Sequence, residues 1–118
     1  MFHINKVNGT GNIEEVLNSY TSGGRAEGKS ILISKENKII VCGNTNSLGI
    51  GETDALLLKL NLDGSELVTL SFGGNYNDSA NHIIQTKDGG YLMVGNSENA
   101  DGTSDILVIK TDQNGNVN

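Results

Sequence analysis

Residues capable of acid-base or nucleophilic chemistry are few and far apart in this chain. Its only histidines are His3 and His82, and its only cysteine is Cys42. No Ser-His-Asp arrangement can be assigned, no Gly-x-Ser-x-Gly motif is present, and two histidines in separate elements do not form a metal-ligand pattern. His82 lies beside two isoleucines, which favours a structural histidine over a general base. Cys42, in the apolar run IIVCG, is expected to be a small buried side chain. We therefore predict no enzyme activity, no catalytic residue, no metal and no cofactor.

Two stretches resemble ligand-binding loops only in part. Gly49-x-Gly51-x-x-Asp54 lacks the third glycine of a dinucleotide fingerprint, and a strand rather than a helix is expected after it. Residues 61–64 and 112–115 place oxygen-bearing side chains as in the first half of a calcium loop, but the closing bidentate glutamate is missing. Because Asp-Gly and Asn-Gly are also common hairpin residues, we favour tight turns over calcium binding at both places.

Charged residues recur at matching positions in two parts of the chain. Asp54 and Asp105 each follow a glycine-containing loop, and Lys59 and Lys110 each come five residues later. A recurring carboxylate could bind a ligand, but we favour the interpretation that it accepts hydrogen bonds from the backbone of its own loop. The opposite charges suggest structural pairing, and an exposed pair contributes at most roughly 1 kcal/mol.

A weaker pattern points to sugar recognition. Tyr20, Arg25, Tyr76 and Asn77 fall close to the Gly-Gly pairs at 23–24 and 73–74. An aromatic ring can stack on the apolar face of a sugar, while amide and charged groups bond to its hydroxyls. These four residues are the candidate ligand-binding set, and several equivalent weak sites would add avidity.

The composition fits short strands joined by many turns. The chain has 118 residues, of which 36% are hydrophobic, with 16 glycines, no proline and no tryptophan. Its formal net charge of -6 argues against nucleic acid or an anionic membrane surface as partner, because both need clustered Lys and Arg. No apolar run approaches the roughly 20 residues that span a bilayer, so no membrane insertion is expected.

An internal repeat is the strongest pattern in the sequence. The stretch SKENKIIVCGN at 34–44 matches TKDGGYLMVGN at 86–96, an offset of 52 (86 − 34). Further on, DALLLKLNLDG at 54–64 matches DILVIKTDQNG at 105–115, an offset of 51 (105 − 54). A third copy of the motif Lys-x-Asn/Asp-x-x-Gly begins at Lys6. Repeat-structural roles are therefore expected for the residues that recur, namely Asp54, Asp105, Lys59, Lys110, Gly43, Gly95, Gly64 and Gly115.

Each period contains strand-like segments separated by turn residues. The expected strands are 29–34, 38–44, 54–61 and 66–72 in the first period and 81–86, 91–97 and 105–112 in the second, preceded by 2–7 and 12–20. Residues 12–20 also carry apolar residues at helical spacing, but the register of the repeat favours a strand. Asp-Gly and Asn-Gly pairs at 63–64, 88–89 and 114–115 predict turns that need positive φ.

A four-stranded antiparallel unit that recurs about every 50 residues is typical of a β-propeller blade. The expected fold class is all-β, with about two four-stranded blades and a partial one. Residues 1–22 would form the C-terminal hairpin of the partial blade, 23–72 the first blade, and 73–118 a second blade without its outer strand. Two blades cannot close a ring, so we expect a fragment of a longer array or a protomer that completes a ring with other copies.

The stretch at 71–115, SFGGNYNDSANHIIQTKDGGYLMVGNSENADGTSDILVIKTDQNG, resembles a known repeat family. The family pattern is YGG, D-x-A, TxDGGYxxxGxT and DxxxxKxDxxG, which is widespread in secreted and surface proteins of bacteria and some archaea and is regarded as a β-propeller repeat. The resemblance is weaker at 20–64, where Glu36, Asn37 and Lys38 replace Asp-Gly-Gly and Gly28 stands in place of Ala80. The family's usual Trp after the aspartate is absent.

This resemblance implies a non-catalytic module at the cell surface or outside the cell, acting as a scaffold or protein-interaction surface. The alternative is a carbohydrate-binding, lectin-like module with one weak site in each blade. The implied partners are further propeller blades, supplied by self-association or by a parent chain, and a protein or glycan.

Overall fold

Antiparallel β-strands make up the fold, which the computed structural model describes at residues 2–7, 10, 13–19, 26–46 and 53–117. The strands are β1 (Phe2–Val7), β2 (Ile13–Ser19), β3 (Ala26–Ile33), β4 (Ile39–Thr45), β5 (Asp54–Leu60), β6 (Glu66–Phe72), β7 (Asp78–Gln85), β8 (Tyr91–Glu98) and β9 (Ser104–Thr111). The described residues contain no helix, and therefore none that could cross a membrane. The predicted all-β class is confirmed, and β2 confirms the strand predicted at 12–20.

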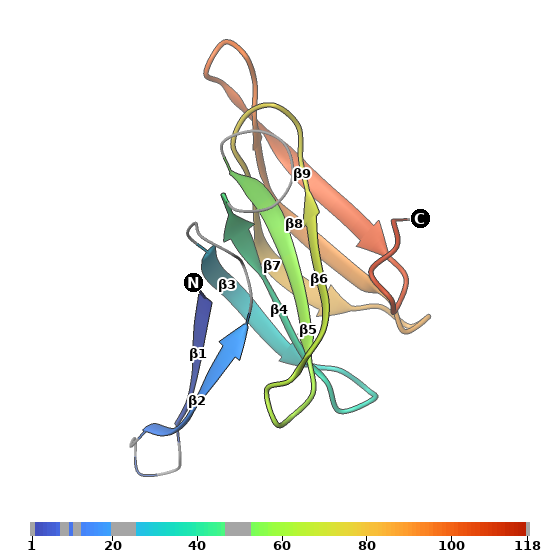
Figure 1. Cartoon of the computed structure of the whole chain (residues 1–118). Coiled ribbons are helices and arrows are strands. Elements are labelled where there is room, and N and C mark those ends of the chain that lie inside the picture. The colour runs from blue at the N-terminus through green and yellow to red at the C-terminus, as the bar shows by residue number, and fades with distance from the viewer. Residues whose placement is uncertain (1, 8–9, 11–12, 20–25, 47–52, 118) are drawn as a thin grey trace.

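The strands form three sheets in which neighbours in sequence are also neighbours in space (Figure 1). A two-stranded hairpin, β1-β2, is followed by a four-stranded sheet, β3-β4-β5-β6, and by a three-stranded sheet, β7-β8-β9. All pairs are antiparallel. Beyond β9, an isolated bridge joins Thr111 to Val117. These two residues lie one repeat period, 51 residues, after Leu60 and Glu66, which pair in the four-stranded sheet.

The first strand of each larger sheet is longer than the sequence predicts. Strands β3 and β7 begin three residues before their predicted starts, at Ala26 and Asp78. Both strands carry a register shift at the same point of the repeat, between Gly28 and Ser30 in β3 and between Ala80 and His82 in β7. A bulge inserts an extra residue without ending the ladder, so pairing continues past a break in the apolar alternation.

One kind of five-residue turn recurs in the two larger sheets. The N–H of its first residue donates to the carbonyl of the fifth, and the N–H of its fourth donates to the carbonyl of the first. The fourth residue has a positive φ, as expected for a type I turn followed by a bulge. The turns occupy 34–38, 61–65, 86–90, 99–103 and 112–116. The predicted turns are confirmed, and the one at 99–103 was not predicted, although its Asp101-Gly102 pair carries the same pattern.

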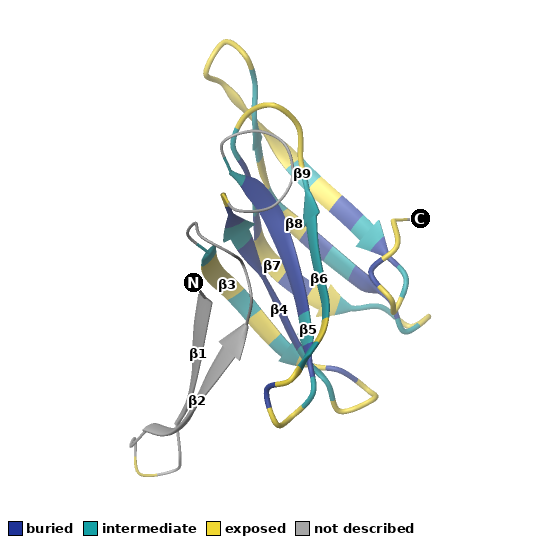
Figure 2. Ribbon diagram, in the orientation of Figure 1, coloured by how far each residue is buried: buried dark blue, intermediate teal, exposed yellow. Residues whose placement is uncertain are grey.

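The main core lies between the two larger sheets, where β7 packs against β3, β4 and β5 (Figures 1 and 2). The four-stranded sheet contributes Ile40, Cys42, Ala55 and Leu57, and the three-stranded sheet contributes Ala80, Ile83, Tyr91, Met93 and Ile109. The predicted burial of Cys42 is confirmed, and desolvation raises the pKa of its thiol to about 11. Such a thiol is protonated at neutral pH and is a poor nucleophile.

The central strands β4 and β5 are covered on both faces. Opposite the main core, Val41, Leu58 and Leu60 form a second buried cluster against Ala26 and Ile39. This double burial explains why β5 reads as a nearly continuous apolar run rather than as an alternation of apolar and polar residues.

Asn37 is the one described residue other than glycine with a positive φ, of 60°, at the fourth position of its turn. Asn37→Ala should lower the free energy of unfolding by about 1 kcal/mol, because alanine is disfavoured in the left-handed region. Asn37→Gly, the matched control, should be at least as stable as the original chain. Urea denaturation measures both, and an equal loss in the two variants would contradict the explanation.

Candidate functional site

The starts of β5 and β7 meet at one end of the two larger sheets. The Asp78 N–H donates to the Thr53 carbonyl at 2.8 Å, and the Asn44 amide donates to the Ser79 hydroxyl at 3.1 Å. These bonds join the sheets beside a pocket of about 470 Å³. We call this region the polar junction, and the pocket is lined by Asn44, Asn46, Thr53, Asn77, Asp78, Ser79 and Asn96.

Two carboxylates are buried at the polar junction. Asp54 is 2% exposed and Asp78 is 4% exposed. An oxygen of Asp78, Oδ2, accepts the Gly74 N–H at 2.9 Å, whereas Oδ1 of Asp54 is buried without a hydrogen-bond partner among the described residues. Burial, and then the negative charge of Asp78, raise the pKa of Asp54. The junction therefore concentrates negative charge that the described hydrogen bonds only partly compensate.

The predicted sugar-binding residues divide into two groups. Tyr20 and Arg25 lie outside the described residues. Asn77 lines the pocket, and its amide donates to Oε2 of Glu98 at 3.2 Å. Tyr76 is exposed but does not line the pocket. The described part of the chain thus brings one of the four predicted residues to a concave polar surface.

The two recurring aspartates have different surroundings, although they hold the same place in the repeat. Asp54 is buried by the neighbouring sheet, whereas Asp105 is exposed and accepts a hydrogen bond from the Asn99 side chain of its own loop at 3.1 Å. At Asp105 the partner in the loop is a side-chain amide, where a backbone N–H was expected.

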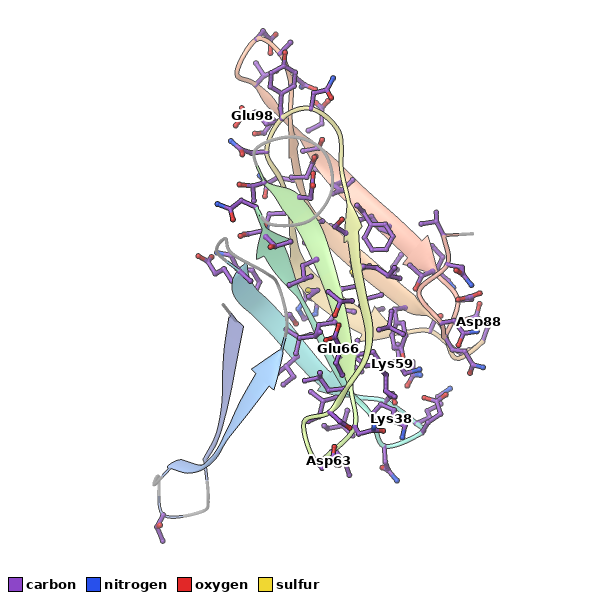
Figure 3. The ribbon with its side chains drawn as sticks, viewed as in Figure 1. Lys38, Lys59, Asp63, Glu66, Asp88 and Glu98 are labelled. Carbon is purple, nitrogen blue, oxygen red and sulfur yellow. The ribbon has the colours of Figure 1, made fainter. Side chains whose placement is uncertain are left out.

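The predicted pairing of these aspartates with the recurring lysines is wrong. Lys59 Nζ donates to the Gln113 carbonyl at 3.0 Å, and Lys110 Nζ forms an ion pair with Asp88 at 3.1 Å. Asp54 begins β5 and Lys59 lies near its other end, roughly 16 Å away at about 3.3 Å per residue. Figure 3 shows Lys59 and Asp88 at the end of the sheets opposite to Glu98.

Close backbone contacts explain two of the recurring glycines. Gly43 pairs with Gly28 and Gly95 pairs with Ala80, next to the two bulges. A Cβ atom on Gly43 would lie 1.7 Å from the Glu27 carbonyl oxygen, and one on Gly95 would lie 1.8 Å from that of Ser79. The other recurring glycines, Gly64 and Gly115, are the fourth residues of their turns, with φ near 90°.

The turns that resemble half of a calcium loop use their carboxylates internally. Asp63 Oδ1 accepts the Ser65 N–H at 2.9 Å, and Asp112 Oδ1 accepts the N–H groups of Asn114 and Asn116 at 2.8 and 2.9 Å. The hydrogen bonds from the Ser65 hydroxyl and then the Ser65 N–H lower the pKa of Asp63, and the bond from the Asn116 N–H lowers the pKa of Asp112. Among the described residues, no group of three or more His, Cys, Asp and Glu side chains lies together as a metal site.

The one described histidine side chain contacts a serine. His82 is exposed, and its Nδ1 lies 3.4 Å from the Ser30 hydroxyl. The side chain of His3, together with Gly49 and Gly51, lies outside what the structure describes. Among the described residues, no carboxylate bonds to the His82 ring. His82 and Ser30 therefore lack, within the described residues, the third group of a catalytic triad.

Asp78 was not singled out from the sequence as a site residue. It belongs to the D-x-A element of the repeat pattern, so a carboxylate at the entry of β7 could have been noticed. The corresponding position of the first period, 52 residues earlier, is Ala26, and repeat matching therefore gave no emphasis to Asp78.

No protein-family model matches the chain, and no curated protein matches it.

Gly95→Ala tests the close contact beside the bulge. Its methyl group would meet the Ser79 carbonyl, so we expect a loss of about 3 kcal/mol or failure to fold. Gly74→Ala is the matched control, because a Cβ there meets nothing within 4 Å. Circular dichroism during urea unfolding measures both, and equal stability of the two variants would disprove the contact.

Asp88→Asn tests the contribution of turn hydrogen bonds to acid stability. The Thr86 hydroxyl, the Gly90 N–H and Lys110 lower the pKa of Asp88. A lowered pKa contributes stability above the unfolded value of about 3.9, and this stability is lost as the pH falls through the lower folded value. The original chain should therefore weaken below about pH 4, and Asp88→Asn should weaken less steeply there. Thermal melts between pH 2 and pH 6 measure this, and an unchanged pH profile would refute it.

Proposed function

We propose that this chain is a non-catalytic β-propeller repeat module at the cell surface or outside the cell, acting as a scaffold that binds another blade. One observation carries the proposal. The exposed apolar face of the three-stranded sheet is the repeat counterpart of the face that the four-stranded sheet buries in the core.

The correspondence follows the repeat offsets. The four-stranded sheet places Leu32, Cys42, Ala55 and Leu57 against the three-stranded sheet. Adding 52 to the first two numbers and 51 to the others gives Ile84, Val94, Ile106 and Val108. These four residues are exposed by 47%, 42%, 81% and 61%. We call them the open face.

The two sheets pack head to tail. On the other face of the three-stranded sheet, Met93 and Ile109 lie in the main core. Their counterparts in the four-stranded sheet, Val41 and Leu58, lie on the side away from that core. The one contact between the two larger sheets therefore joins opposite faces of the repeat. A contact of this kind repeats, giving a ring when the rotation closes and a linear array when it does not.

The repeat also indicates what would cover the open face. A contiguous exposed apolar surface is typical of an interaction site. The surface that fits it inside this chain is the Met93 and Ile109 face of a blade, so the expected partner is another blade of the same repeat class. A second copy of the chain is the source of such a blade in a purified sample.

Carbohydrate binding is a second candidate function, and the pocket at the polar junction favours it. Amide side chains of Asn44, Asn77 and Asn96 line this pocket, and amides commonly bond to sugar hydroxyls. Titration with millimolar sugars, followed by NMR shifts in the original chain and in Asn77→Ala, tests it. An absence of shifts in the original chain would remove this candidate.

Solution mass tests the proposed blade contact. Size exclusion with light scattering should show a mass that increases with concentration, because the open face associates with a second copy. The double variant Ile106→Asp, Val108→Asp should remain monomeric, since both exposed side chains become charged. Leu62→Asp is the matched control, because Leu62 is 52% exposed on a turn outside the open face, and it should associate like the original chain. A monomeric original chain at several hundred micromolar would contradict the proposal.

A further inference from the structure

We propose that Asp54 and Asp78 form a binding site for one hard divalent cation, such as Ca²⁺, between the two larger sheets. This inference concerns the polar junction and does not depend on the association of blades through the open face.

The two carboxylates lie close together beside Gly73. Asp54 Oδ1 and Asp78 Oδ2 each lie 2.5 Å from the position that a Cβ atom on Gly73 would occupy. The two oxygens are therefore no more than 5.0 Å apart (2.5 + 2.5). Since Ca²⁺ binds oxygen at about 2.3–2.6 Å, one ion can bridge two oxygens with a separation of up to about 5 Å. A side chain at position 73 would clash with both oxygens, so this arrangement of the two carboxylates requires glycine there.

Burial points to a missing positive partner. Asp54 is 2% exposed, and no described group forms a hydrogen bond with its Oδ1. Burying a carboxylate without a partner is unfavourable unless a cation or a proton compensates its charge. The described ion pairs, Lys29 with Glu27 and Lys110 with Asp88, involve neither carboxylate. No described lysine side chain reaches the pair.

The surroundings suit a hard cation. Ca²⁺ takes six to eight oxygen ligands, including carboxylates, amide carbonyls and water. The adjoining pocket of about 470 Å³ has room for water, and Asn77 and Ser79 line it with oxygen-bearing side chains. The Gly74 N–H bond to Asp78 Oδ2 fixes the orientation of that carboxylate. The site has no described thiol or imidazole ligand, so oxygen-preferring ions are favoured over Zn²⁺.

The repeat predicts one such site in the chain. The counterpart of Asp78 in the first period is Ala26, and the counterpart of Asp54 in the second period is the exposed Asp105. Neither counterpart lies in a second buried carboxylate pair, so the expected stoichiometry is one ion for each chain.

Calorimetric titration of the chelator-treated chain with CaCl₂ tests the site. We expect one ion for each chain, a dissociation constant below about 1 mM, and a melting temperature higher by about 5 °C at saturating Ca²⁺. Asp54→Asn and Asp78→Asn should each weaken binding at least about tenfold, because each removes one charged ligand. Asp105→Asn is the matched control and should bind like the original chain. Circular dichroism checks that each variant is folded, and the two site variants provide independent tests.

Three results would overturn the proposal. The first is an absence of heat and of a melting shift with Ca²⁺, Mg²⁺ and Mn²⁺ alike. The second is unchanged binding in Asp54→Asn or Asp78→Asn. The third is a melting temperature that is unchanged by these ions but falls as the pH rises from 4 to 7. In that case Asp54 and Asp78 would share a proton instead of a metal ion.

Discussion

The structure depends on one packing constraint: strands inside the larger sheets carry apolar side chains on both faces. In β4, Ile40 and Cys42 face one side, and Val41 faces the other. A sheet of this kind loses stability unless both faces are covered, because uncovered apolar area remains in water. The four-stranded sheet meets this requirement in its central strands, whereas β9 does not, since Ile106 and Val108 are exposed while Ile109 is buried.

The same packing creates the polar junction. When β7 lies against the four-stranded sheet, the start of β7 comes beside the start of β5, and the two strands bring Asp78 and Asp54 together. The electrostatic character of an aspartate at this repeat position therefore depends on whether another sheet follows. Asp54 and Asp105 show this directly, because the same residue type at the same repeat position is buried in one case and exposed in the other.

Much of the secondary structure could be predicted because it is local. Apolar runs separated by turn residues identified the strands, and β6 was predicted with its observed bounds. Bulges at Gly28 and Ala80 could not be predicted, since they depend on the partner strand. The pairing of the recurring aspartates with the recurring lysines was wrong because recurrence in a sequence does not show which charges meet, and Asp54 and Lys59 lie near opposite ends of β5. The Asp54–Asp78 contact likewise depends on how two sheets pack, which a single repeat does not encode.

Head-to-tail packing has a consequence for how such a chain can change in length. Because the two larger sheets meet through opposite faces of the repeat, inserting or deleting a whole period of 51 or 52 residues would leave the interfaces of the proposed array of the same kind. A partial insertion would instead place two like faces together or leave a strand without its ladder partner. Recombination within the gene could therefore add or remove complete sheets with little penalty to folding, whereas breakpoints inside a sheet would be selected against.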